Sequence, residues 1–98
     1  MSETTQSAKP LPLRQSEDGT WEVENVAGNW IRCHTEQDAR ILSNAPVVLE
    51  QSYTSVFPDE ALAVRLEETA QILEDYKIGF ESRFFRSRAK RARGEQSK

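Results

Sequence analysis

The sequence predicts an α+β domain in which a small antiparallel β-meander comes first and helices follow. Three observations predict it. Apolar and polar or charged residues alternate with period two over residues 20–26 and 30–34, which is typical of strands with one buried face. Apolar residues recur at helical spacing from residue 36 onward, and turn-forming residues separate the segments. Of the 98 residues, we expect 1–10 to be a disordered tail, 11–85 a single small domain, and 86–98 a basic, frayed C-terminal tail.

The meander has two or three strands, depending on residues 11–15. Pro12 restricts a strand there to the edge of the sheet, and residues 16–19 form a turn. We expect the next two strands to form a hairpin with the three-residue loop Ala27–Asn29, which pairs Val26 with Trp30. A two-residue turn of Gly28 and Asn29 would shift the register by one and mix the two faces.

The three-residue loop assigns each hairpin side chain to a face. The buried face carries Trp21, Val23, Ile31 and Cys33. The exposed face carries Glu22, Glu24, Arg32 and His34. Val26 and Trp30 also lie away from the buried face, so they are a candidate exposed interaction patch.

A kinked helix pair is predicted next. Thr35 is placed to cap the first helix, over residues 36–44, with Asp38 in the reciprocal position of a capping box. Pro46 cannot continue that helix but suits the first turn of a second one. The second helix is short and carries Val48, Leu49 and Tyr53.

The last element is predicted to be a long amphipathic helix. It begins at Pro58 and, if continuous to Arg93, would be roughly 54 Å long, whereas a compact chain of this size has a radius of gyration of about 13 Å. It must therefore overhang the domain or break. If it breaks, Gly79 is the expected place, and the phenylalanines fold back onto the hairpin face. We favour the overhang, because its apolar stripe would be covered by a second copy. The candidate self-association residues are Leu66, Leu73, Tyr76, Phe80 and Phe84.

Charge is strongly polarised along the chain. Residues 1–75 carry fourteen acidic and five basic side chains, and residues 76–98 carry two and eight, so the net charge of −3 combines about −9 and +6. Cations near a helix C-terminus complement its dipole and a basic tail favours solubility, but the same cluster is also a candidate anion or nucleic-acid contact. Its members are Arg83, Arg86, Arg88, Lys90, Arg91 and Arg93.

Catalysis, metal binding and membrane insertion are not expected. Cys33 and His34 are adjacent in a strand and point to opposite faces, so they cannot act as nucleophile and base. We therefore expect no enzyme, no cofactor, no metal and no small-molecule substrate. The longest apolar run, from Ala45 to Leu49, is far shorter than the ~20 residues of a membrane span. Without a secretory signal, the expected location is the cytoplasm.

The segment from Gln37 to Glu50 reads QDARILSNAPVVLE. It resembles a segment common in short uncharacterised phage and prophage proteins, roughly N/D-A-R-L-I-A-A-A-P-E-L-L-E, which a small β-meander precedes. The likeness covers about residues 11–52 and departs at Ser43, Asn44, Val47 and Val48. It implies the order hairpin, helix, Pro-kink, helix and a phage-associated origin, and it implies no catalytic residues.

Two functions follow as expectations. The first is a non-enzymatic protein-interaction module that self-associates through its C-terminal helix, most simply as a homodimer. The second is a nucleic-acid-binding accessory protein that uses the basic C-terminal segment. An acidic protein surface is a further partner that this segment suits.

Overall fold

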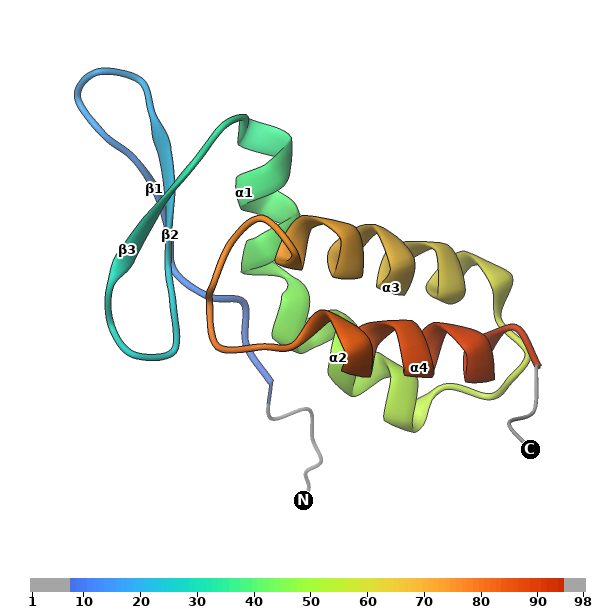
Figure 1. Cartoon of the computed structure of the whole chain (residues 1–98). Helices are drawn as coiled ribbons and strands as arrows, with labels where there is room; N and C mark the ends of the chain where they lie inside the picture. The colour runs from blue at the N-terminus through green and yellow to red at the C-terminus, as the bar shows by residue number, and fades with distance from the viewer. Residues whose placement is uncertain (1–7, 95–98) are drawn as a thin grey trace.

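The computed structural model describes residues 8–94, in which a three-stranded sheet is followed by four helices (Figure 1). The predicted α+β class is confirmed. The predicted N-terminal tail, 1–10, falls mostly on residues 1–7, which lie outside the described residues. The elements are β1 (Leu13–Gln15), β2 (Trp21–Glu24), β3 (Trp30–Cys33), α1 (Glu36–Ser43), α2 (Ala45–Thr54), α3 (Glu60–Leu73) and α4 (Ser82–Ala92).

The sheet has the order β1-β2-β3 and is antiparallel throughout. Val23 lies at its centre, opposite Leu13 on β1 and Ile31 on β3. Trp21 lies opposite Cys33, so the four side chains predicted to share the inner face do share it. Val23 and Cys33 are buried there, whereas Trp21 and Ile31 are half-buried against the core.

The hairpin register differs from the predicted one. Glu24, and not Val26, lies opposite Trp30. The difference arises in the loop, where the Asn25 side chain accepts hydrogen bonds from the backbone N–H groups of Ala27 and Asn29 at 3.0 and 2.9 Å. Gly28 takes the left-handed conformation, with a φ of +90°. The loop is therefore Val26–Gly28, one residue earlier than expected. The partner of each residue across the hairpin changes by two positions, and this even shift preserves both faces because side chains alternate with period two.

The outer face of the sheet is closed by charged side chains. Glu22, predicted to be exposed, is only 8% exposed. Arg14 and Arg32 approach its carboxylate from the two neighbouring strands, at 2.7 and 3.6 Å. Arg14 also lies 3.9 Å from the centre of the Trp30 ring and covers it in part. The prediction of an exposed Glu22 was wrong because its partners, brought in by strand pairing, are large enough to cover it.

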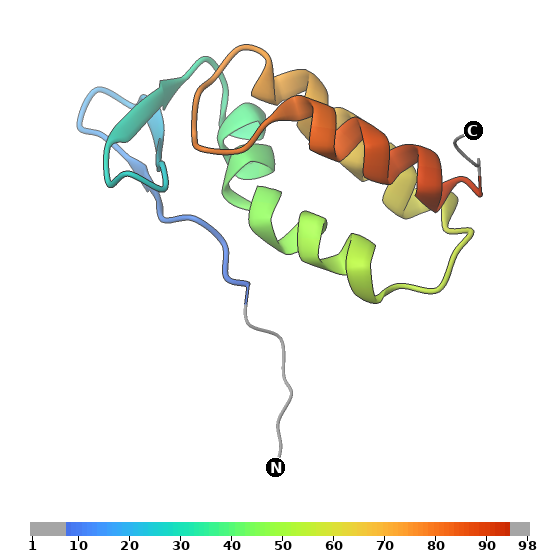
Figure 2. The ribbon, with the colours of Figure 1, turned by 60° about the horizontal axis from the view of Figure 1, so that its bottom comes forward.

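The helix pair follows the predicted order, with a different use of Asp38. The Thr35 hydroxyl accepts a hydrogen bond from the Asp38 N–H at 3.0 Å, as expected of an N-cap. The Asp38 carboxylate accepts a hydrogen bond from the Tyr76 hydroxyl at 3.1 Å. Pro46 lies in the first turn of α2. Helix α1 packs on the inner face of the sheet, and α2 runs beside the last two helices (Figure 2).

The predicted long helix is interrupted, so the overhang that we favoured is wrong. Helices α3 and α4 lie side by side and antiparallel, joined by residues 74–81 (Figures 1 and 2). Gly79, the predicted break point, has a φ of +103°. A Cβ at Gly79 would overlap the Cγ2 methyl of Val26, whose N–H donates to the Ile78 carbonyl at 3.2 Å. The hairpin loop and the interhelical linker therefore fit each other only because residue 79 has no side chain.

Helix α4 belongs to the core, and the predicted frayed tail from residue 86 is wrong for residues 86–92. Phe85, Ala89 and Ala92 have no exposed surface and pack against α3. Phe85 follows Phe80 by five residues, which in one continuous helix places it about 140° around the axis. The apolar side chains of α3 and those of α4 therefore face one core only because the chain reverses direction between the two helices. Residues 95–98 lie outside the described part of the chain.

Candidate interaction surface of the last two helices

Acidic residues of α3 and arginines of α4 form a line of ion pairs along one side of the helix pair. Glu60 and Glu67 on α3 and Glu74 at its C-cap are spaced by seven, as are Arg86 on α4 and Arg93 at its C-cap. Residues seven apart lie on one line of a helix, and the antiparallel packing brings the two lines together. Arg86 pairs with Glu74, and Arg93 pairs with Glu67 and, at 3.2 Å, with Glu60. We call these five residues the seam.

Every charged side chain of the seam is paired with a side chain of opposite charge. Hydrogen bonds from Arg93 to both carboxylate oxygens of Glu67 lower the pKa of that carboxyl below its ordinary value. The same bonds raise the pKa of the Arg93 guanidinium. The seam therefore neutralises two of the eight basic side chains of residues 76–98 within the chain.

Arg88 is directed to the other side of α4 and contacts α2. Its Nε donates to the Ser52 hydroxyl at 3.0 Å, and its guanidinium also donates to the Ser52 carbonyl. The guanidinium lies 4.1 Å from the centre of the Tyr53 ring. Ser52 is in the last turn of α2, where carbonyl groups have no partner within the helix. Arg88 therefore stabilises the end of α2.

The remaining basic side chains of α4 are at the surface. Arg83, Lys90 and Arg91 are exposed, together with Phe84, which is 53% exposed. Arg83 pairs with Glu81, two residues earlier in the sequence, at 2.6 Å. Within residues 8–94, neither Lys90 nor Arg91 forms an ion pair with another side chain. Three of the six predicted anion contacts are thus in use by the fold, and three point to solvent.

Most of the predicted self-association residues are covered by their own chain. Leu66, Leu73 and Tyr76 are at most 6% exposed. Phe80 is half-buried and meets the Phe85 ring edge-on, with 6.2 Å between the ring centres. Leu66, Leu73 and Tyr76 are therefore not available as a surface, and Phe80 is available only in part. Phe84 is exposed because Phe85, the next residue, takes the buried position.

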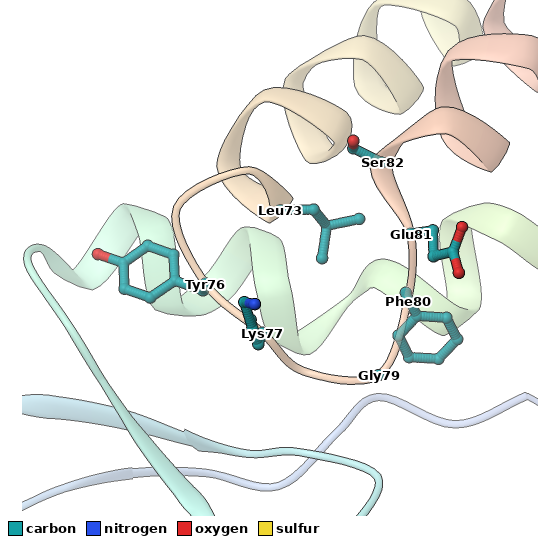
Figure 3. Close-up of a pocket in the computed structure, with 7 residues that line it drawn as sticks. All are labelled: Leu73, Tyr76, Lys77, Gly79, Phe80, Glu81 and Ser82. Atoms are coloured by element: carbon teal, nitrogen blue, oxygen red, sulfur yellow. The ribbon is translucent and has the colours of Figure 1, made fainter.

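An open pocket of about 470 Å³ lies beside the linker between α3 and α4. Figure 3 shows Leu73 and Phe80 around it, with Glu81 pointing away from Leu73. The Tyr76 ring points away from the linker, and its hydroxyl accepts from the His34 N–H at 2.8 Å while donating to Asp38. Burial raises the pKa of this hydroxyl, so it remains protonated as the donor that Asp38 needs. The remaining lining residues, Lys77, Gly79 and Ser82, do not assemble a nucleophile with a base.

Cys33 and the acidic residues give no reactive or metal-binding cluster in the described part of the chain. Burial raises the pKa of the Cys33 thiol to about 11, so it is protonated at neutral pH. Among residues 8–94, no group of three His, Cys, Asp or Glu side chains is arranged to hold a metal ion. No helix within the same residues combines the length and apolar character needed to cross a membrane.

An exposed apolar pair at the end of α2 was missed by the sequence analysis. Tyr53 is 64% exposed and Val56 is 88% exposed. Tyr53 was assigned to the second helix without a role at the surface. The available signal was Val56, an apolar residue in a link between helices, where a buried position is uncommon.

Comparison with known proteins found no match for this chain. No protein-family model matches the chain, and no curated protein or solved structure is significantly similar to it. The class that the fold defines is an α+β domain in which a β-meander and α1 support a bundle of three further helices. The resemblance to phage proteins stays a prediction.

Proposed function

We propose that this protein is a non-enzymatic protein-interaction module that self-associates through its C-terminal helix. The observation that carries the proposal is the division of α4 into two parts. One side is occupied by the core, the seam and the end of α2, and the other presents Arg83, Phe84, Lys90 and Arg91 to solvent.

The composition of that exposed side suits a protein partner. Aromatic and arginine side chains are enriched at the centres of protein interfaces, where a buried ring and a planar cation contribute most of the binding energy. Phe84 supplies the ring, and the neighbouring cations supply complementarity to an acidic surface. The same protein has such a surface on α3 and directly after it, because Glu68 and Asp75 are exposed.

Sedimentation equilibrium from low to high micromolar protein tests self-association. We expect a concentration-dependent shift from monomer to dimer, and we expect Phe84→Ser to weaken it. Val56→Ser is the matched control, since Val56 is also an exposed apolar side chain but lies near the other end of α4. Asp59, which follows Val56 closely in the sequence, donates its N–H to the carbonyl of Ala92, the last residue of α4, whereas Phe84 is in the first turn. A monomer throughout the range would contradict the proposal.

Nucleic-acid binding is the second candidate, and the same exposed cations favour it. We propose in this case that Arg83, Lys90 and Arg91 contact phosphates while Phe84 stacks on a base. Each phosphate contact with a single strand adds about −0.7 to the slope of log affinity against log salt, so three cations predict a shallow slope. Retention on a nucleic-acid column over a salt gradient measures it. Equal retention of the wild type and of Lys90→Ala/Arg91→Ala would exclude this role for α4.

A further inference from the structure

Exposed charges of opposite sign lie on the two sides of the seam. Glu68 on α3 and Asp75, two residues beyond the last residue of α3, each follow a seam glutamate by one residue. On α4, Arg83 and Lys90 each precede a seam arginine by three residues. All four side chains are exposed. We call Glu68 and Asp75 the acidic strip and Arg83 and Lys90 the basic strip.

Both strips lie on the same face of the helix pair. Helix α2 covers the opposite face, where Arg88 of α4 contacts Ser52 and Arg65 of α3 contacts Gln51 at 3.0 Å. Glu68 and Asp75 come one residue after a seam glutamate, which rotates them about 100° away from the seam. Arg83 and Lys90 come three residues before a seam arginine, which rotates them about 60° away from it in the same helical sense. Because the helices are antiparallel, these rotations lead to the same face, away from α2.

A face with one acidic and one basic strip is complementary to itself. A two-fold axis parallel to the helices places α4 of one copy over α3 of the other, with the helices antiparallel. Arg83 and Lys90 are seven residues apart, as are Asp75 and Glu68, so Arg83 can face Asp75 of the second copy while Lys90 faces its Glu68. The axis repeats both pairs. A two-fold axis across the helices would instead set each strip against itself.

We propose that the face of the α3/α4 pair carrying the two strips is the dimer surface of this protein, occupied by a second copy in this reciprocal arrangement. The inference rests on the proposed self-association and specifies its geometry. Val64, 42% exposed on α3, is an apolar side chain on the same face. The existing pair between Arg83 and Glu81 competes little, since both side chains are more than half exposed. Exposed ion pairs dominate the surface, so the dimer weakens as salt is added.

Charge exchange between the strips tests the arrangement. Arg83→Glu/Lys90→Glu gives a face with two acidic strips, and Glu68→Lys/Asp75→Lys gives one with two basic strips. We expect each variant alone to dimerise about tenfold or more weakly than the wild type at low salt, because like charges then face each other. We expect an equimolar mixture of the two to form a heterodimer, measured by native mass spectrometry. Circular dichroism of each variant checks that these surface changes leave the fold intact.

The outcomes separate this inference from the function on which it rests. A wild-type protein that stays monomeric at low salt and high micromolar concentration contradicts self-association itself. If the wild type dimerises and both variants dimerise as strongly as the wild type, the dimer surface lies elsewhere. That result overturns this inference and leaves self-association standing. Two folded variants that are monomeric separately and together also overturn the reciprocal arrangement. A heterodimer from the mixture supports it, because only opposed strips are restored by mixing.

Discussion

The basic side chains of α4 and of its C-cap Arg93 belong to one segment, yet they divide into two groups with different roles. Arg86, Arg88 and Arg93 contact α3 or α2 and stabilise the fold, whereas Arg83, Lys90 and Arg91 are exposed. Residue type does not distinguish the groups, because arginine occurs in both. Position around the helix does, since a residue facing a neighbouring helix meets a carboxylate or a carbonyl there. A basic cluster therefore indicates a binding site only through those of its side chains that have no partner within the folded chain.

Replacing Gly79 strains the turn that brings α4 back against α3, and it has the largest expected effect on the free energy of unfolding. Gly79→Ala adds a Cβ that overlaps Val26 in a conformation, φ +103°, that side chains disfavour. We expect the free energy of unfolding to fall by about 3 kcal/mol or more. Gly28→Ala is the control, since Gly28 has a similar φ of +90° with no atom within 4 Å of the added Cβ. It should cost about 1 kcal/mol. Equal losses in urea denaturation would show that Val26 makes no difference.

Removing Arg88 and Arg91 separately sharpens the comparison between a contacting and an exposed arginine. Arg88→Ala leaves the Ser52 carbonyl without its partner and uncovers the Tyr53 ring, so we expect a loss of about 1–3 kcal/mol. Arg91→Ala should change the free energy of unfolding by less than about 0.5 kcal/mol. Urea denaturation of the two variants measures both values. Comparable losses would mean that the two groups are not distinct.

Lowering the pH tests the seam through Glu67. Its carboxyl has a lower pKa in the folded chain than its ordinary value of 4.5, so its contribution to stability is complete above that value. The contribution is lost as the pH falls through the folded pKa, when Glu67 takes up a proton. Glu67→Gln should therefore make the stability less dependent on pH in the acid range. Glu68→Gln, one residue away and outside the seam, should retain the wild-type dependence. Parallel urea titrations at neutral and acid pH compare them.

The smallest expected effect is the coupling within a single exposed pair. A double-mutant cycle between Arg86 and Glu74 should give about 0.2–1 kcal/mol, because both side chains are 43–45% exposed. The corresponding cycle between Lys90 and Glu68, measured at high salt where the protein is monomeric, should give no coupling. A coupling between Lys90 and Glu68 under those conditions would place them in contact within one chain.

Local patterns predicted most elements, and the errors arose at places where one element meets another. The alternation of Trp21, Val23, Ile31 and Cys33 correctly predicted the inner face of the sheet, because a buried face requires period two. The Thr35 cap was predicted from its position alone. The burial of Glu22 was not, since its partners come from both neighbouring strands. The hairpin register depends on Asn25, whose side chain shapes the loop and whose role a residue count does not reveal.

The candidate surface illustrates the same division. The dense basic segment and the apolar repeat through Leu66 and Leu73 are visible in the sequence, and each was interpreted as needing a partner. The structure supplies much of that partner from the chain itself: the core of the domain buries Leu66 and Leu73, and the seam neutralises Arg86 and Arg93. Phe84 and Phe85 are adjacent, so the pattern could not decide which of them is buried until the direction of α4 was known.

The sequence by itself determined the α+β class, the order of the elements, Gly79 as the place where the last helix can break, and the opposite charges of its two parts. These properties depend on backbone conformation and on spacing within one element, which neighbouring residues control. Only the tertiary structure decided that the helix folds back, which arginines pair internally, and which charges remain at the surface. Those outcomes depend on the angle at which α3, α4 and α2 meet, and packing of residues distant in the sequence sets that angle.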